Sequence, residues 1–259
     1  MSISTFIPSV WANELILGFE EQSIIAQVTF PVPTTKSGKY IINKMGEVSV
    51  QKYQGQVEYG ELDLTSVEVP FDTANYFAFA IKDLDKAQVA SDLRAPALEK
   101  ATAKMAKTVD EDMVARVLAS EAHKEVVALS KSNVYDAIVD ANLRLNQKDV
   151  PATNRVVLCG HDVIAMLLKD ADFKASVHRN VMENGMEVFR INGVEILPTN
   201  RVAAGTIIVL HKSAVAYGMQ IDEVEALRLP DTFADGVRGL HNYGITVVLP
   251  EAIEIVAAQ

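Results

Sequence analysis

Residues 76–88 read YFAFAIKDLDKAQ, and residues 96–117 read PALEKATAKMAKTVDEDMVARV. In the second stretch apolar side chains recur every three or four residues, which places them on one side of an α-helix. This stripe consists of Leu98, Ala101, Met105, Val109, Met113 and Val117. Pro96 suits the first turn of a helix, and helical character is expected over about 85–121. The sequence therefore predicts one long helix that follows an aromatic run.

Two extended pieces are expected before the aromatic run. A short amphipathic helix near the start has an apolar face made of Trp11, Leu15 and Phe19. Pro31 and Pro33 then force extended chain, so this segment is expected to dock as an arm on another body. Residues 38–68 are rich in β-forming side chains that partly alternate with polar ones, and glycines punctuate them. This pattern predicts a protruding hairpin.

The chain after Ser130 has an α/β pattern. Helices are expected over about 132–145 and 162–169, and the apolar run RVVLC at 155–159 predicts a buried strand between them. Asn192-Gly193 is a strong signal for a tight hairpin turn. Further strands are expected at 206–210, 214–217, 224–229, 245–249 and 252–256.

Composition limits the possible functions. The chain has 259 residues, a net charge of −10 and a single cysteine, Cys159. One cysteine excludes an internal disulfide framework and a multi-cysteine metal site, and it fits folding in a reducing cytosol. An acidic surface disfavours a protein that grips nucleic acid, but it does not argue against a container for DNA, whose wall should not stick to its contents. No targeting segment or membrane span is recognised, so a soluble cytoplasmic product is expected.

A search for catalytic motifs finds none. Phosphate-binding glycine loops, a nucleophile elbow and a zinc helix are absent from the sequence. His161 and Asp162 follow a strand, where the simpler reading is a helix start that Asp162 caps. Cys159 is expected to be a buried structural thiol rather than a nucleophile. We therefore predict no catalytic residue, no cofactor and no metal site, and favour a structural role over an enzyme.

Four stretches resemble one protein family. They are FIPSVW at 6–11, SGKYII at 37–42, the return from Tyr53 to Leu62, and the aromatic-then-acidic run at 76–88. Together with the order of elements, they resemble the major capsid proteins of tailed bacteriophages of the Hong Kong 97 type. Asp110 falls where such proteins often place an acid on the long helix.

The resemblance implies an α+β fold with an N-terminal arm, an extended hairpin called the E-loop, a long spine helix and an α/β axial domain. The implied ranges are an arm at 1–37, an E-loop at 38–81, a peripheral domain at 82–123 and 224–259, and an axial domain at 124–223.

The resemblance also implies a function. Copies of the chain would form pentamers and hexamers, and these would close into an icosahedral shell around the double-stranded DNA of a tailed phage. Implied partners are a separate scaffolding protein, a portal protein, a decoration protein and packaged DNA held without specific binding, with no membrane. The protein would be made in the host cytoplasm and reside in the virion capsid.

Contacts between copies are expected to bury apolar side chains of the arm and the hairpin. The predicted assembly residues are Trp11, Leu15, Phe19, Tyr40, Ile42, Val48, Val50, Tyr53 and Tyr59.

Three alternatives remain open on sequence alone. An encapsulin-like nanocompartment shell has the same fold and would differ by holding protein cargo. A soluble α/β enzyme with an unfamiliar site around His161 and Cys159 would be a stable monomer or dimer with a pocket. A phage tail or head-completion protein would form rings or tubes.

Overall fold

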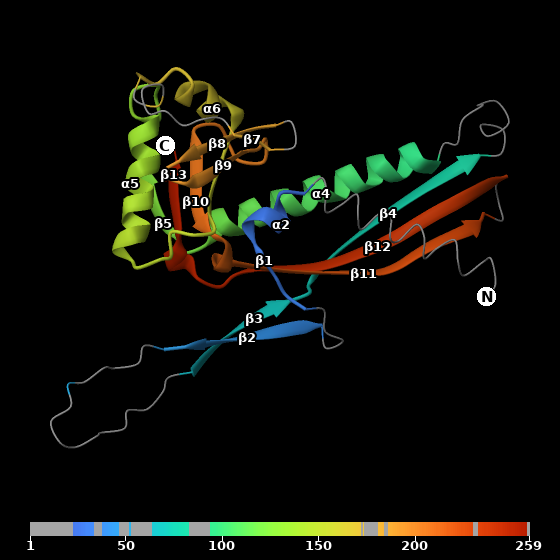
Figure 1. The fold of residues 1–259 in the computed structure, drawn as a ribbon. Coiled ribbons are helices and arrows are strands. Elements are labelled where there is room, and N and C mark those ends of the chain that lie inside the picture. Colours follow the sequence, from blue (N-terminus) through green and yellow to red (C-terminus); the bar gives the residue numbers. More distant parts are fainter. Residues whose placement is uncertain are drawn as a thin grey trace.

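The computed structural model describes residues 23–33, 38–46, 52, 64–82, 94–171, 173, 181–183, 186–229 and 233–257. Within these residues the strands form a four-stranded, a seven-stranded and a two-stranded sheet. Figure 1 shows an elongated sheet with a long helix beside it, a compact α/β body at one end, and a hairpin that extends away from both. The predicted helix with Trp11, Leu15 and Phe19 lies outside the described residues.

The elongated part combines a four-stranded sheet with the long helix α4 (Arg94–Ala119). In spatial order the strands are β1 (Phe30–Pro31), β11 (Val215–Arg228), β12 (Ala234–Val247) and β4 (Thr73–Lys82). β11 and β12 form a long antiparallel hairpin, and β4 pairs antiparallel with β12 along its whole length. At 26 residues, α4 is a rod of about 39 Å at 1.5 Å per residue.

The predicted apolar stripe is the face that α4 buries. Leu98, Met105, Val109, Met113 and Val117 are all buried, and Ala101 is half-buried. The helix was expected to begin near residue 85, but residues 83–93 lie outside the described part of the chain. Its described C-terminal end falls two residues before the expected one.

The compact body is a mixed seven-stranded sheet. Its spatial order is β5 (His123–Val126), β13 (Ile253–Ala257), β10 (Thr206–His211), β6 (Arg155–Cys159), β9 (Val194–Pro198), β8 (Met186–Ile191) and β7 (Val181–Glu183). Its helices are α5 (Val134–Gln147) and α6 (His161–Leu167). The predicted turn between β8 and β9 is confirmed, since Asn192 and Gly193 both have positive φ, at 51° and 82°.

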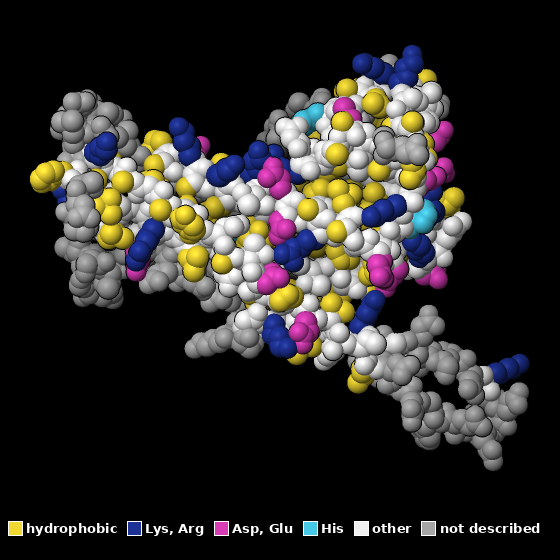
Figure 2. Space-filling view, turned by 180° about the vertical axis from the view of Figure 1, so that it is seen from behind, with side chains coloured by type: hydrophobic (Ala, Val, Ile, Leu, Met, Phe, Trp, Pro, Cys, Tyr) yellow, Lys and Arg dark blue, Asp and Glu magenta, His cyan; other side chains and the backbone are white. Residues whose placement is uncertain are grey.

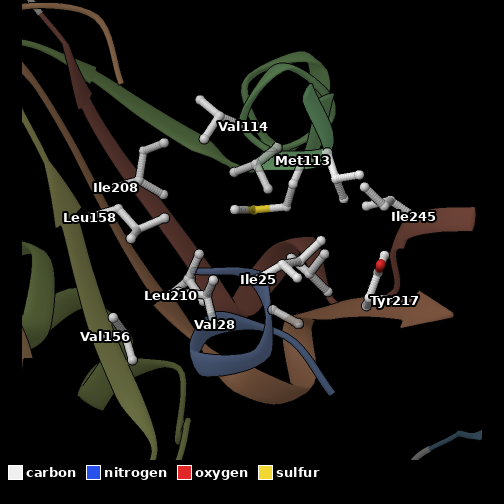
Figure 3. Packing of buried hydrophobic residues seen from close by; sticks show 14 of the residues in the cluster. Ile25, Val28, Met113, Val114, Val156, Leu158, Ile208, Leu210, Tyr217 and Ile245 are labelled. Carbon is white, nitrogen blue, oxygen red and sulfur yellow. The ribbon is translucent and has the colours of Figure 1, made fainter. Parts of the chain in front are cut away.

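Both faces of this sheet are covered, which explains the continuous apolar run of β6. Val157 and Cys159 face a cluster formed with α5 and α6, whereas Val156 and Leu158 face the cluster that contains α4. Strands buried on both faces lose the polar alternation of half-exposed strands. Figure 3 shows the second cluster, where Met113 and Val114 of α4 point toward Leu158, Ile208 and Leu210 of the sheet.

The end of the expected arm packs into this same cluster. The short helix α2 (Ile25–Val28) buries Ile25 and Val28 against α4 and the sheet (Figure 3). Ser23 Oγ donates a hydrogen bond of 2.6 Å to the Asp110 carboxylate of α4. The described part of the arm is therefore held by its own chain.

The hairpin consists of β2 (Lys39–Met45) and β3 (Leu64–Pro70), paired antiparallel as a separate sheet. Two short 3₁₀ helices, η1 (Lys212–Ala214) and η2 (Pro250–Ala252), lie where the strands of the two larger sheets meet.

The sheets divide the chain differently from the expected domain ranges. Residues 73–81 were assigned to the hairpin at 38–81, but β4 pairs with β12, and its Phe77 and Phe79 face the α4 cluster. Residues 253–257 were assigned to the peripheral range 224–259, but β13 lies inside the seven-stranded sheet. β11 begins at Val215 and so crosses the expected boundary at 223/224.

Candidate assembly surfaces

The hairpin leaves the body at a pair of glycines. Gly218 of β11 and Gly244 of β12 are register partners. A Cβ on Gly244 would lie 2.1 Å from the carbonyl oxygen of Pro70, and a Cβ on Gly218 would lie 2.7 Å from the ring of Phe71. Both distances are shorter than any non-bonded contact can be. The chain leaving β3 therefore crosses the sheet at a point where only glycine leaves room.

The two faces of the hairpin differ. Tyr40 and Ile42 are half-buried and pack against a small cluster of Val32, Val69, Ala216 and Val248. Ile41, between them, is 48% exposed, and Leu64 on the paired strand is 65% exposed. Side chains alternate between the faces of a strand, so the outward apolar side chains are Ile41 and Leu64.

Ion pairs fix the hairpin. Lys39 and Glu68 lie 2.7 Å apart across its two strands. Lys44 contacts Glu251 of η2 at 2.9 Å and so ties the hairpin to the body. Burial would raise the pKa of Glu251, but its backbone hydrogen bond and the Lys44 ammonium together hold that pKa below its usual value. Both pairs are half-exposed, so each contributes little stability and mainly restricts orientation.

The four-stranded sheet has an exposed apolar face on the side away from α4. Tyr76 of β4 is 81% exposed and Leu240 of β12 is 39% exposed. They line a hollow of about 420 Å³ together with Ala78 and Gly239, and the Glu225–Arg238 ion pair borders it. A second hollow of about 320 Å³ continues the surface past Ala80, Leu227 and Leu229. Hydrophobic side chains gather along this elongated part in Figure 2.

The tip of the β11–β12 hairpin adds one more exposed aromatic side chain. Phe233 is 86% exposed there. Solvent-exposed apolar groups of this size, placed along one surface, are typical of protein contact sites. We call the surface formed by Tyr76, Ala78, Ala80, Leu227 and Leu240 the outer sheet face.

A polar network holds α4 on the opposite face of this sheet. The Arg116 guanidinium donates to the carbonyl oxygen of Ile245 at 2.9 Å, to Thr73 Oγ1 at 2.9 Å and to Asp112 at 3.1 Å. One side chain thus links the helix to both β12 and the start of β4.

His241 lies nearby, between sheet and helix. Its side chain is 1% exposed, and its ring stacks on Tyr243 with 5.1 Å between centroids. Burial lowers the pKa of His241 to about 4 and raises the pKa of Tyr243 to about 12. Both groups are therefore neutral at physiological pH.

Two buried carboxylates join other elements. Asp110 anchors Ser23, and burial raises its pKa. Glu254 of β13 is wholly buried and receives hydrogen bonds from Lys148 at 2.5 Å and Arg144 at 2.9 Å. Burial alone would raise the pKa of Glu254, but these partners, with His123, hold it below its ordinary value. These contacts join β13 to α5, to Lys148 just after α5 and to the neighbouring strand β5.

The region around Cys159 and His161, which the enzyme alternative would use as its active site, does not form a reactive centre. Burial raises the pKa of the Cys159 thiol to about 12, which suppresses the nucleophilic thiolate. Asp162 does not cap α6 as expected; its carboxylate accepts a hydrogen bond of 2.7 Å from the Gly205 amide. Among the described residues, no group of three or more His, Cys, Asp or Glu side chains is placed to hold a metal.

The family to which the chain belongs follows from a comparison with protein-family models. A family described as phage capsid protein matches residues 65–257, well over half of the chain. The chain belongs to the phage capsid protein family. The alternative of a tail or head-completion protein is thereby disfavoured, and the expectation from the resemblance is confirmed.

Solved structures support the same family and its Hong Kong 97-type fold. A structure from Mycobacterium phage Che8 is 26% identical and has a TM-score of 0.68, covering 91% of this chain and 87% of that one. The capsid structure of the cyanophage P-SCSP1u is 15% identical with a TM-score of 0.73, covering 92% and 88%. No curated protein matches the sequence. The chain is a major capsid protein.

The same fold also occurs in an encapsulin. The encapsulin SrpI complex from Synechococcus elongatus is 12% identical with a TM-score of 0.66, covering 90% of this capsid protein and 86% of that chain. At this identity the likeness concerns the fold alone. The family match, by contrast, is to phage capsid proteins.

Of the nine predicted assembly residues of this capsid protein, the structure describes two. Tyr40 and Ile42 lie on the inner side of the hairpin rather than on its outward face. Trp11, Leu15, Phe19, Val48, Val50, Tyr53 and Tyr59 lie outside the described residues and stay predictions. The outer sheet face was missed, because Tyr76 was considered only as part of the aromatic run that precedes the long helix. The signal that would have revealed this face is the strict alternation of inward and outward side chains along β4.

Within the described part of this capsid protein, no helix is both long and apolar enough to cross a membrane.

Proposed function

We propose that this capsid protein assembles into pentamers and hexamers that close into an icosahedral shell around double-stranded DNA. The observation that supports it best is the pair of exposed apolar surfaces, one on the hairpin and one on the outer sheet face. Figure 1 shows the hairpin extending away from the elongated sheet, so the two surfaces do not meet within one chain. A second copy is needed to cover them.

The hairpin would lie across a neighbouring copy. Its outward Ile41 and Leu64 suit the apolar hollows around Tyr76 and Leu240. The glycine crossing and the Lys44–Glu251 pair set the direction in which the hairpin leaves the body. Because each subunit makes several such contacts at once, modest individual contacts add up to a stable closed shell.

The charge of the chain suits a container for DNA. At −10 the average surface repels phosphates. A wall that does not bind its contents lets a genome be packed and released. Packaged DNA would therefore be a content of the shell and not a specifically bound ligand.

Other partners are proposed from the family resemblance. They are a separate scaffolding protein during assembly, a portal protein at one vertex and a decoration protein on the outside. The elongated sheet with α4 would serve as the peripheral domain, and the seven-stranded sheet as the axial domain at the capsomer centre. Assembly would take place in the host cytoplasm, with the finished shell in the virion.

A protein-filled nanocompartment is the second candidate, since the encapsulin structure has the same fold. The contents of purified particles distinguish the two. Nuclease-protected double-stranded DNA in particles from an infected host supports the phage head, and a co-purifying cargo protein without DNA supports the compartment.

A pair of leucine variants tests the proposed contact. Leu240→Asp places a charge in the outer sheet face, and the expected result is at least a tenfold loss of particles measured by light scattering. Leu143→Asp is the matched control, because Leu143 of α5 is 50% exposed and lies outside both surfaces. An unchanged particle yield for Leu240→Asp would contradict the proposed contact, as would an equal loss in both variants.

A further inference from the structure

β4 is the edge strand of the elongated sheet. It pairs with β12 from Thr73 to Lys82 in a continuous register, and no described strand pairs with its other side. Along an edge strand every second residue points both its N–H and its C=O group outward. This row of groups is a template for another strand.

The edge lacks the features that usually protect such strands. Across its ten residues β4 has no proline, no bulge and a single charged residue, Lys82, at its end. Natural sheets guard long edges with inward charges, prolines or irregularities, because unguarded edges pair with other chains. In a member of a self-assembling family, an unguarded edge of this length indicates a contact used in assembly.

We propose that the outer edge of β4 pairs antiparallel with β4 of a second copy, about a two-fold axis at Phe77. The inference rests on the proposed shell assembly and adds to it a specific contact between copies. In this register the numbers of two facing residues add up to 154, so Phe77 of one copy faces Phe77 of the other. Lys82 then faces Asp72 of the second copy, and the reverse pair forms at the other end.

Charge complementarity selects this register. A shift of two residues either way places Lys82 opposite Pro70 or Ala74, neither of which carries a charge. Asp72 can accept a second cation, because its side chain is 54% exposed and lies 3.4 Å from Arg116. Opposite charges on facing strands stabilise a pair modestly but discriminate between registers.

The faces of the two sheets also agree. Residues 74, 76, 78 and 80 alternate outward along β4, whereas Phe77 and Phe79 face the α4 cluster. The register places Ala74 opposite Ala80 and Tyr76 opposite Ala78, so exposed side chains meet exposed side chains. The outer sheet faces of two copies would form one continuous surface.

Cysteine pairs test the contact directly. In the double variant Ala74→Cys/Ala80→Cys, the two cysteines of one chain are separated by about 20 Å of strand at 3.3 Å per residue, too far for an internal disulfide. Across the proposed axis they face each other. Mild oxidation of assembled particles should convert most chains to disulfide-linked dimers on a non-reducing gel. The native Cys159 is buried and does not interfere.

The matched control is Ala74→Cys/Ala78→Cys, which differs in register by two residues. Dimers from the first variant alone support the proposal. Particles that form normally but give no dimers overturn it while leaving shell assembly intact. Dimers in equal amounts from both variants also overturn it, because they would reflect random encounters.

A charge variant provides a measurement that needs no new cysteine. Lys82→Asp would face Asp72 of the second copy and should lower particle yield several-fold. Lys100→Asp, on the exposed side of α4, is the control and should change it little. Equal yields from the two variants would contradict the pairing. If the unmodified protein forms no particles at all, the proposed function fails first.

Discussion

At the residue scale, glycines and buried titratable groups shape the elongated part of the molecule. Gly218 and Gly244 let the hairpin cross the sheet in close contact, and Gly239 makes room for the ring of Phe77. His241 and Tyr243 stack on each other beneath α4, and Arg116 joins α4 to the sheet. We expect assembly to depend on these residues, because they orient the surfaces that would meet other copies.

Gly244→Ala tests the hairpin crossing. The added methyl group would lie 2.1 Å from a backbone oxygen that has no room to move aside. We expect a loss of at least about 1–3 kcal/mol in the free energy of unfolding, measured by urea denaturation. Gly236→Ala on the same strand is the control, since its nearest neighbour is the mobile end of the Leu229 side chain, 3.2 Å away. Equal stability of both variants would contradict the close crossing.

Because His241 is buried as a neutral ring, we expect the free energy of unfolding to fall in acid. Its pKa is about 4 in the folded chain and 6.5 when unfolded. The unfolded state therefore binds the proton first as the pH falls. The stabilisation is complete above pH 6.5 and declines between pH 6.5 and 4, by up to about 3 kcal/mol.

The matching variant is His241→Phe, which keeps a ring against Tyr243 and cannot be protonated. The difference in unfolding free energy between the two proteins should change across this pH window, because all other groups titrate in both. A constant difference would show that His241 is not buried in neutral form.

At the element scale, the N-terminal segment combines two roles. Ile25 is 1% exposed in the core formed with α4, and Trp11 is expected to contact another copy. Ile25→Ala should cost about 2–5 kcal/mol of folding stability, as large-to-small core changes do.

Trp11→Ala should leave the melting temperature near that of the parent protein and reduce particle yield. A Trp11→Ala protein that is unfolded would contradict the arm assignment.

Elements whose structure depends on local pattern were predictable from sequence. The stripe on α4, the buried β6 and the Asn192-Gly193 turn each follow from a few adjacent residues. Sheet membership was not predictable in this way. β4 and β13 look like any apolar strands, and their partners are not their neighbours in sequence. β4 pairs with β12, more than a hundred residues later, and β13 lies between β10 and β5.

The candidate surfaces show the same limit. The sequence indicates that the hairpin carries apolar side chains, but the face that turns inward depends on packing against Ala216 of the distant strand β11 and against Val32, next to β1. Tyr40 and Ile42 were therefore chosen over Ile41. The exposed outer sheet face becomes visible only once α4 is placed on the opposite side.

At the scale of the whole molecule, the fold combines an α/β body with two long projections (Figure 1). One of the two largest apolar clusters lies within the body, and the other joins the body to α4 and the elongated sheet. The hairpin and the outer sheet face carry apolar side chains that stay exposed in one copy. In a shape of this kind, the extended projections leave apolar surface exposed to water, which lowers the stability of the single copy. Its exposed surfaces fit a subunit that completes its burial in an assembly.

Electron microscopy of the purified protein after size-exclusion chromatography tests the central claim most directly. The account predicts closed polyhedral shells, or uniform rings with five-fold and six-fold symmetry, formed by the chain alone or with a co-expressed scaffolding protein. A discrete monomer or dimer that never assembles under either condition would contradict it.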